Sequence, residues 1–142
     1  MKSIITLLLF TSTILPSTQT TTYSGEYTKK TKTKKGEILE WTLSLRDDGT
    51  FLYHFYRDLN CHQCVEEHFY GKGTWTASKK VIIFNTRETD IDINHTINLN
   101  KSKARVYIKS LKNKSKKDHT PSIRFYTSET SSIKGLQLYL EE

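Results

Sequence analysis

Side chains that alternate between apolar and polar are the feature that most limits how this chain can fold. Leu39, Trp41, Leu43 and Leu45 occupy every second position of residues 39–45, and polar residues stand between them. A period of two places one set of side chains on each face of a β-strand. The segment therefore predicts a strand with one buried face.

The same alternation returns along the chain as far as residue 140. The strands expected from it cover residues 23–28, 39–46, 50–57, 69–76, 81–84, 96–99, 104–111, 122–127 and 133–140. Asp47-Asp48-Gly49 and Ser78-Lys79-Lys80 supply tight turns between two pairs of these segments. No stretch repeats apolar residues with the period of a helix.

Eight or nine short strands in succession are typical of an antiparallel up-and-down meander. Closing such a sheet removes its exposed edges and leaves an interior wide enough for side chains or one small ligand. Gly71 and Gly73 share a strand face with Phe69 and Trp75, which leaves room there for a bend or a neighbouring ring. We therefore expect an all-β protein with a lipocalin-like barrel of about eight strands, closed or half open.

The first residues have the layout of a signal peptide. Lys2 precedes a short apolar run at residues 4–10, and small polar residues follow as far as Thr22. The apolar run is shorter than the roughly 20 residues that a membrane-spanning helix needs. We expect a signal peptide at residues 1–19, one domain at residues 20–142, and a periplasmic or secreted protein.

The chain is basic, with 22 Lys and Arg against 15 Asp and Glu, or a formal charge of +7 at pH 7. The basic residues gather in two segments, which contain Lys29, Lys30, Lys32, Lys34 and Lys35, and then Lys101, Lys103, Arg105, Lys109, Lys112, Lys114, Lys116 and Lys117. Such segments are most often solvated, and the alternative is contact with an anionic surface. Export argues against nucleic acid as a partner, and we expect a monomer.

Cys61 and Cys64 are the only cysteines, and His54, His62 and His68 lie near them in the sequence. Two cysteines in an exported protein most simply form a disulfide. The alternative is a metal site in which Cys61, Cys64, His62 and His68 provide sulfur and imidazole ligands. Thiol exchange is a third interpretation, but it usually requires a helix after the cysteine pair, and none is expected.

Aromatic residues are common on the predicted inward faces. Trp41, Phe51, Tyr53, Phe55 and Trp75 are the candidates for a ligand-binding wall, as in a barrel that holds an apolar molecule. The alternative is that these rings simply fill the core of a small domain. The sequence alone leaves both interpretations open.

The chain contains neither a Gly-x-Ser-x-Gly motif nor a glycine-rich phosphate loop. Glu66 and Glu67 are neighbours on a strand, so they point to opposite faces rather than act together. We expect no enzymatic activity and no cofactor. The main hypothesis is an exported binding protein for a small apolar ligand or an envelope protein, and the alternative is a metal-binding or envelope-stress protein that uses Cys61, Cys64 and the nearby histidines.

Two motifs in residues 36–85 carry a resemblance to a known family. One is the hairpin L-x-L-x-x-D-G-T-F-x-Y from Leu43 to Tyr53, and the other is G-x-G-T-W from Gly71 to Trp75, followed by the strand at residues 81–84. The combination resembles small secreted lipocalin-like proteins of Bacteroidetes-type bacteria, in which a DGTF hairpin and a G-x-W strand recur. This resemblance implies a lipocalin-like barrel.

A second resemblance is to the N-terminal barrel of copper-stress envelope lipoproteins, which also carry a Cys-x-x-Cys motif and a DGTF-like turn. This chain has no cysteine near its N-terminus for lipidation, and its Cys61 and Cys64 follow the turn instead of preceding it. The resemblance therefore implies the barrel but not the copper-sensing role.

Overall fold

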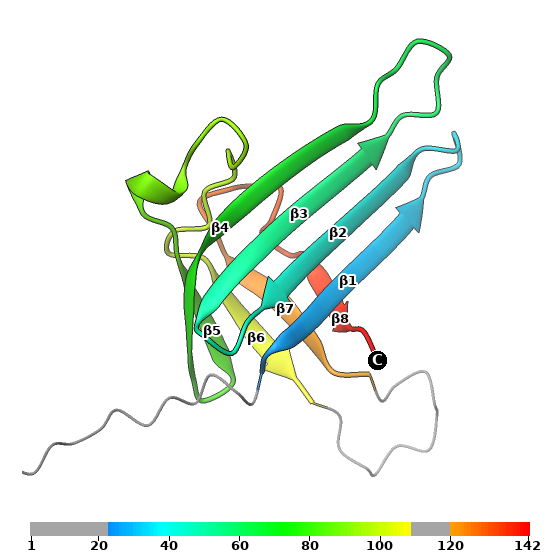
Figure 1. Ribbon diagram of the computed structural model, residues 1–142. Coiled ribbons are helices and arrows are strands. Elements are labelled where there is room, and N and C mark those ends of the chain that lie inside the picture. The colour runs from blue at the N-terminus through cyan, green and yellow to red at the C-terminus, as the bar shows by residue number, and fades with distance from the viewer. Residues whose placement is uncertain (1–22, 109–119) are drawn as a thin grey trace, which may run out of the picture.

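The structure is a computed structural model that describes residues 23–108 and 120–142. Eight antiparallel strands form a closed barrel in which each strand pairs with its neighbours in the chain and β1 pairs with β8 (Figure 1). The strands are β1 (Gly25–Lys32), β2 (Ile38–Leu45), β3 (Thr50–Asp58), β4 (Glu67–Ser78), β5 (Val81–Asn85), β6 (Lys103–Tyr107), β7 (Ser122–Thr127) and β8 (Gln137–Leu140). The predicted all-β up-and-down barrel is confirmed. The predicted signal peptide, residues 1–19, lies outside the described residues.

The two predicted tight turns are present. Gly49 has a φ of +83°, and the main-chain N–H of Thr50 donates to Oδ1 of Asp48 at 2.9 Å, which closes the β2–β3 turn. Lys79 and Lys80 have φ values of 49° and 65°, the left-handed pair that a two-residue hairpin requires. These turns set the register of the two hairpins, in which Leu45 faces Phe51 and Ser78 faces Val81.

The strands are unequal in length, so one side of the barrel extends past the other. β1–β4 have 8, 8, 9 and 12 residues, whereas β5–β8 have 5, 5, 6 and 4. β8 pairs with β1 only at Tyr27 and Thr28, and β5 pairs with β4 only from Thr74 onward. The far halves of β1–β4 consequently project beyond the closed part as a four-stranded extension, which we call the arm (Figure 1). The arm comprises residues 29–32, 38–41, 55–58 and 67–69.

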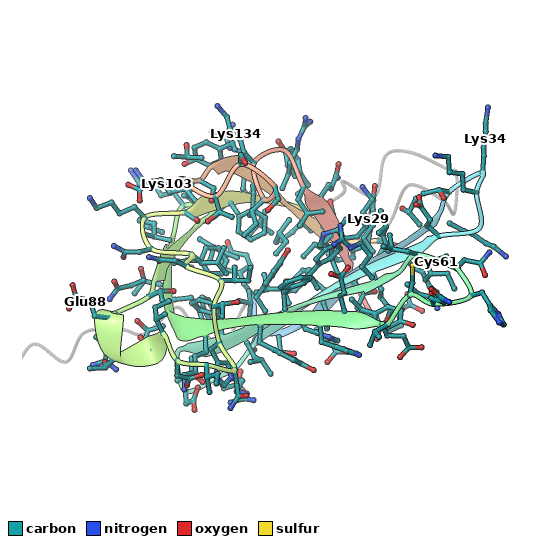
Figure 2. All side chains as sticks on the ribbon, turned by 90° about the horizontal axis from the view of Figure 1, so that it is seen from above. Lys29, Lys34, Cys61, Glu88, Lys103 and Lys134 are labelled. Carbon is teal, nitrogen blue, oxygen red and sulfur yellow. A yellow bond between two sulfur atoms is a disulfide. The ribbon has the colours of Figure 1, made fainter. Side chains whose placement is uncertain are left out.

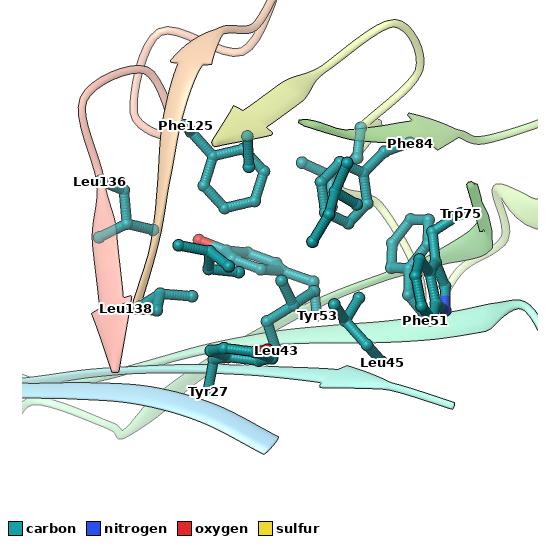
Figure 3. Packing of buried hydrophobic residues seen from close by; sticks show 14 of the residues in the cluster. Tyr27, Leu43, Leu45, Phe51, Tyr53, Trp75, Phe84, Phe125, Leu136 and Leu138 are labelled. Carbon is teal, nitrogen blue, oxygen red and sulfur yellow. The ribbon is translucent and has the colours of Figure 1, made fainter. Parts of the chain in front are cut away.

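The closed part is filled by side chains from all around the barrel (Figure 3). The ring of Phe84 lies between those of Phe51 and Phe125, with centroids 5.1 Å and 5.2 Å away. Each of the following is at most 7% exposed: Tyr27, Leu43, Leu45, Phe51, Tyr53, Trp75, Ile82, Phe84, Leu99, Ala104, Val106, Ile123, Phe125, Ile133, Leu136 and Leu138. Burial of this apolar surface is the main force that stabilises the barrel.

The strand predicted at residues 96–99 is wrong. These residues belong to the long β5–β6 connection, which also contains a turn of 3-10 helix, η2 (Glu88–Asp90). Ile97 still donates its N–H to the carbonyl of Tyr70 at 2.9 Å, so the segment touches the edge of β4 without continuing along it. It lies against Gly71, where an added Cβ would come within 2.7 Å of the Ile97 carbonyl oxygen. The apolar residues alternate in this segment because it packs over the barrel as a loop, and not because it forms a strand.

Two predicted strands are longer than the observed ones. The segment predicted at residues 133–140 forms a strand only over Gln137–Leu140, because residues 131–135 form a turn in which Ile133 is buried. The segment predicted at residues 104–111 is β6 as far as Tyr107, and residues 109–111 lie outside the described part. Among the described residues, no helix has the length and apolar character that a membrane crossing requires.

Candidate functional site

Three aromatic rings form a row across the inner face of the arm. Trp41 on β2 is paired in register with Phe55 on β3, and Phe55 with Phe69 on β4. The ring centroids of Trp41 and Phe55 are 5.3 Å apart, and those of Phe55 and Phe69 are 6.0 Å apart, with interplanar angles of 25° and 20°. All three side chains are half-buried. We call Trp41, Phe55 and Phe69 the aromatic strip.

Charged side chains stand at two borders of the aromatic strip. Lys29 of β1 is opposite Trp41 in register, and its Nζ lies 5.4 Å from the centroid of the indole ring. This is the geometry of a cation–π contact. Farther out along the arm, Arg57 pairs with Glu67, and this guanidinium lowers the pKa of the Glu67 carboxyl. The strip thus offers an apolar surface with an ammonium group at its edge.

The residues predicted to bind a ligand fall into two groups. Trp41 and Phe55 lie in the aromatic strip, whereas Phe51, Tyr53 and Trp75 are 2–3% exposed in the closed part. The indole N–H of Trp75 lies 3.1 Å from the carbonyl oxygens of both Arg46 and Thr50, which ties this ring to the β2–β3 turn. The buried three are part of the core, so only the half-buried pair has ring surface left for another molecule.

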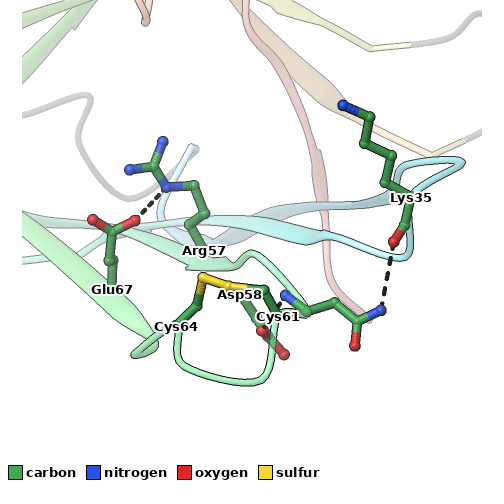
Figure 4. The surroundings of a disulfide bond; sticks show 7 residues. Lys35, Arg57, Asp58, Cys61, Cys64 and Glu67 are labelled. Atoms are coloured by element: carbon green, nitrogen blue, oxygen red, sulfur yellow. Dashed lines mark hydrogen bonds and ion pairs between the residues drawn. A yellow bond between two sulfur atoms is a disulfide. The ribbon is translucent and has the colours of Figure 1, made fainter.

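Cys61 and Cys64 are joined in a disulfide within the exposed β3–β4 connection (Figure 4). Their Cα atoms are 5.2 Å apart, and the N–H of Cys64 donates to the carbonyl of Cys61 at 3.1 Å. Figure 2 shows Cys61 near the same end of the arm as Lys34. Nearby, the side-chain amide of Asn60 donates to the carbonyl of Lys35 at 3.5 Å and links the β3–β4 connection to the β1–β2 connection.

The residues of the alternative metal site are not gathered around one point. Cysteine binds a metal ion as a thiolate, and Cys61 and Cys64 are not thiolates because both sulfurs are in the disulfide. His68 is paired instead with His54 on the outer face, and its Nδ1 lies 2.9 Å from Nε2 of His54. Within residues 23–108 and 120–142, no cluster of three or more His, Cys, Asp or Glu side chains is suited to hold a metal ion.

His54 and His68 belong to a patch of rings on the outer face of β3 and β4. The ring of Tyr70 stacks on His54 with centroids 4.4 Å apart, and the ring of Tyr56 lies 5.1 Å from that of His68. Burial and the neighbouring His68 lower the pKa of His54, while Glu40 acts in the opposite direction. The patch therefore favours a neutral His54.

A polar hollow of about 550 Å³ lies where the β5–β6 connection passes over β3 and β4. Asp92 anchors this connection, because its carboxylate contacts Lys72 at 3.1 Å and His95 at 2.9 Å. These contacts hold the pKa of Asp92 far below its usual range. Arg87 and Asp90 line the hollow together with Lys72 and His95, and they pair with each other at 3.5 Å. Several of the charged side chains that line the hollow are thus already paired with other charged side chains of the protein.

Sequence reasoning missed the role of Lys29. The alternation that begins at Tyr27 places Lys29 on the inner face. The predicted strand ends at Thr28, however, so Lys29 is not included among the inward-facing residues. β1 in fact continues to Lys32, and pairing with β2 brings Lys29 opposite Trp41.

Compared with models of protein families, with curated proteins and with solved structures, the chain has no significant match.

Proposed function

We propose that the protein is an exported, lipocalin-like binding protein that holds a small apolar ligand on the aromatic strip. One observation carries the proposal: three half-buried rings, Trp41, Phe55 and Phe69, lie side by side on the inner face of the arm. Binding sites for small molecules are concave, mostly apolar and rich in aromatic side chains. The mouths of β-barrels are among the places where such sites are commonly found.

The neighbours of the strip define the chemistry of the ligand. Rings at stacking distance from one another favour a flat apolar body, which gains contact with each ring face. Lys29 places a positive charge beside Trp41, so an anionic group on the ligand would replace water around this ammonium. We therefore propose a flat apolar ligand that carries one negative charge.

The test uses anilinonaphthalene sulfonate, a probe with fused aromatic rings and a sulfonate group. We expect the probe to bind the folded protein and to quench the fluorescence of half-buried Trp41. Phe55→Leu should weaken binding about tenfold, which corresponds to the loss of about 1.4 kcal/mol of ring contact. Lys29→Gln should weaken binding of the sulfonate but not of an uncharged naphthalene.

The matched control is Tyr56→Leu, because Tyr56 is the neighbour of Phe55 on the same strand and faces outward from the barrel. Binding that is absent from the wild type, or equal in Phe55→Leu and Tyr56→Leu, would contradict the proposal. Native mass spectrometry of protein purified without detergent adds a second readout. A polypeptide that stays bound, in place of a small molecule, would favour an envelope protein as the partner.

A further inference from the structure

The outer face of β5–β8 combines cations with exposed apolar and aromatic side chains. We use the name β5–β8 face for seven outward-pointing residues, namely Ile83, Lys103, Arg105, Tyr107, Arg124, Tyr126 and Tyr139. Lys103 points away from the barrel, on the side of the molecule opposite the sheet of the arm (Figure 2). This face is separate from the aromatic strip.

Two arginines lie directly opposite each other in this face. Arg105 of β6 is paired in register with Arg124 of β7, and both are exposed. Like charges at directly opposed positions destabilise a sheet. No described acidic side chain forms an ion pair with Arg105, Arg124 or Lys103, and the outward positions of β5–β8 contain no Asp or Glu. The positive charge of the face is thus left for an external anion to neutralise.

Tyrosines lie on either side of the arginine pair. Tyr107, Tyr126 and Tyr139 are 45%, 41% and 46% exposed. The guanidinium of Arg105 lies 5.6 Å from the ring centroid of Tyr126, and Tyr107 and Tyr139 both pair with Ser122 between them. Ile83, which is 38% exposed, is opposite Lys103. Rows of apolar surface therefore flank the row of charge.

We propose that the β5–β8 face docks on a lipid bilayer that carries anionic headgroups. Lys103, Arg105 and Arg124 would pair with the headgroup phosphates, since basic residues near such a surface are attracted by its negative potential. Tyrosine is enriched at the membrane–water boundary because its ring is apolar and its hydroxyl is polar. A soluble polyanion would contact only the basic side chains. This face also presents three tyrosines and Ile83, whose apolar surface favours a lipid bilayer over a soluble polyanion as the partner.

The experiment is co-sedimentation of the purified protein with vesicles of phosphatidylcholine alone or with about one third phosphatidylglycerol. We expect binding to the anionic vesicles, little binding to the neutral ones, and weaker binding at high salt. The double variant Arg105→Gln, Arg124→Gln should lower the partition coefficient about 30-fold. This is the effect of losing two basic residues, because each one near an anionic surface contributes about 1 kcal/mol to binding. Tyr107→Thr with Tyr139→Thr should also lower it, without a change of charge.

The matched control is Lys32→Gln with Lys34→Gln, which removes the same charge from exposed positions of β1 and the β1–β2 connection. Circular dichroism of each variant confirms that the barrel is intact. An equal loss of binding in the control would overturn the proposal, because net charge would then be responsible. Equal binding to neutral and anionic vesicles would overturn it as well. So would a protein that does not bind vesicles but binds heparin, with the tyrosine substitutions leaving the binding to heparin unchanged.

Discussion

His54 and His68 meet edge to edge on the outer face of β3 and β4, with Nε2 of His54 2.9 Å from Nδ1 of His68 and the ring planes within 4° of each other. One nitrogen donates a proton and the other accepts it, so the contact requires at least one neutral ring. Glu40 is the carboxylate that acts on His54, and Tyr56 and Tyr70 are the rings that flank the pair. Protonation of both imidazoles would place two positive charges in contact.

We expect this pair to make the barrel less stable in mild acid. The pKa of His54 is lower in the folded protein than in the unfolded chain, so the unfolded chain binds more protons as pH falls through about 6.5. The stability that neutral His54 contributes is therefore present above this pH and is lost below it. Measured by urea unfolding, the free energy of unfolding should fall less between pH 7.5 and pH 5 in His54→Gln than in the wild type. His62→Gln, in the exposed connection, should behave like the wild type, and an unchanged pH dependence in His54→Gln would contradict the prediction.

The aromatic residues of the core and of the arm should differ in their effect on stability. Phe51→Ala removes a buried ring that contacts Phe84, and we expect it to cost about 3–5 kcal/mol. Phe55→Leu keeps much of the apolar volume at a half-buried position and should cost less than about 1.5 kcal/mol. Denaturant unfolding of both variants measures the difference. Equal losses would mean that the strip is as much a part of the core as Phe51.

Gly73→Ala should destabilise the β4–β5 pairing. A Cβ at this buried position would run into the main-chain carbonyl oxygen of Asn85 and approach the ring of Phe51. Because the carbonyl belongs to the adjoining strand, it cannot move aside without disturbing the ladder, and we expect a loss of about 1–3 kcal/mol. The melting temperature measures it. Thr76→Ala at an exposed position of β4 is the control, and a Gly73→Ala variant as stable as this control would refute the clash.

Reduction of the Cys61–Cys64 disulfide should leave the barrel folded. The bond closes a very short loop, and the entropy that such a loop removes from the unfolded chain is worth about 2 kcal/mol. Reductant should lower the urea midpoint by about 1 M at most, the shift that about 2 kcal/mol produces, and should speed amide exchange at residues 58–66. A variant with Cys61→Ser and Cys64→Ser should no longer respond to reductant. Global unfolding on reduction would show that the bond supports more than its own connection.

Asp92→Asn should loosen the β5–β6 connection while the barrel stays folded. The amide keeps the size of the carboxylate but loses its charge, which acts on Lys72 and His95. We expect faster hydrogen exchange at residues 86–98 and little change in the core strands. Asp47→Asn, at an exposed turn position, should leave exchange in the connection as it is. Unaltered exchange in Asp92→Asn would show that the anchor is the packing of Ile97 on β4.

Much of the architecture follows from local patterns. Alternation around Leu43 assigned each side chain of β2 to a face, and Gly49 marked the turn to β3, because both effects depend only on near neighbours in the chain. The same logic failed at residues 96–99, where Ile97 and Leu99 are apolar because they pack over the barrel as a loop. Periodicity in a short segment does not distinguish these two environments.

The sequence by itself determined which side chains face inward, because the direction of a strand side chain depends only on its position in the alternation. The tertiary structure decided which inward rings are covered: Phe51 and Trp75 lie within the closed barrel, while Trp41 and Phe55 lie on the arm. It also brought Lys29 to Trp41, His54 to His68 and Arg105 to Arg124. Strand length and register set these relationships, and both are settled by pairing between distant segments of the chain.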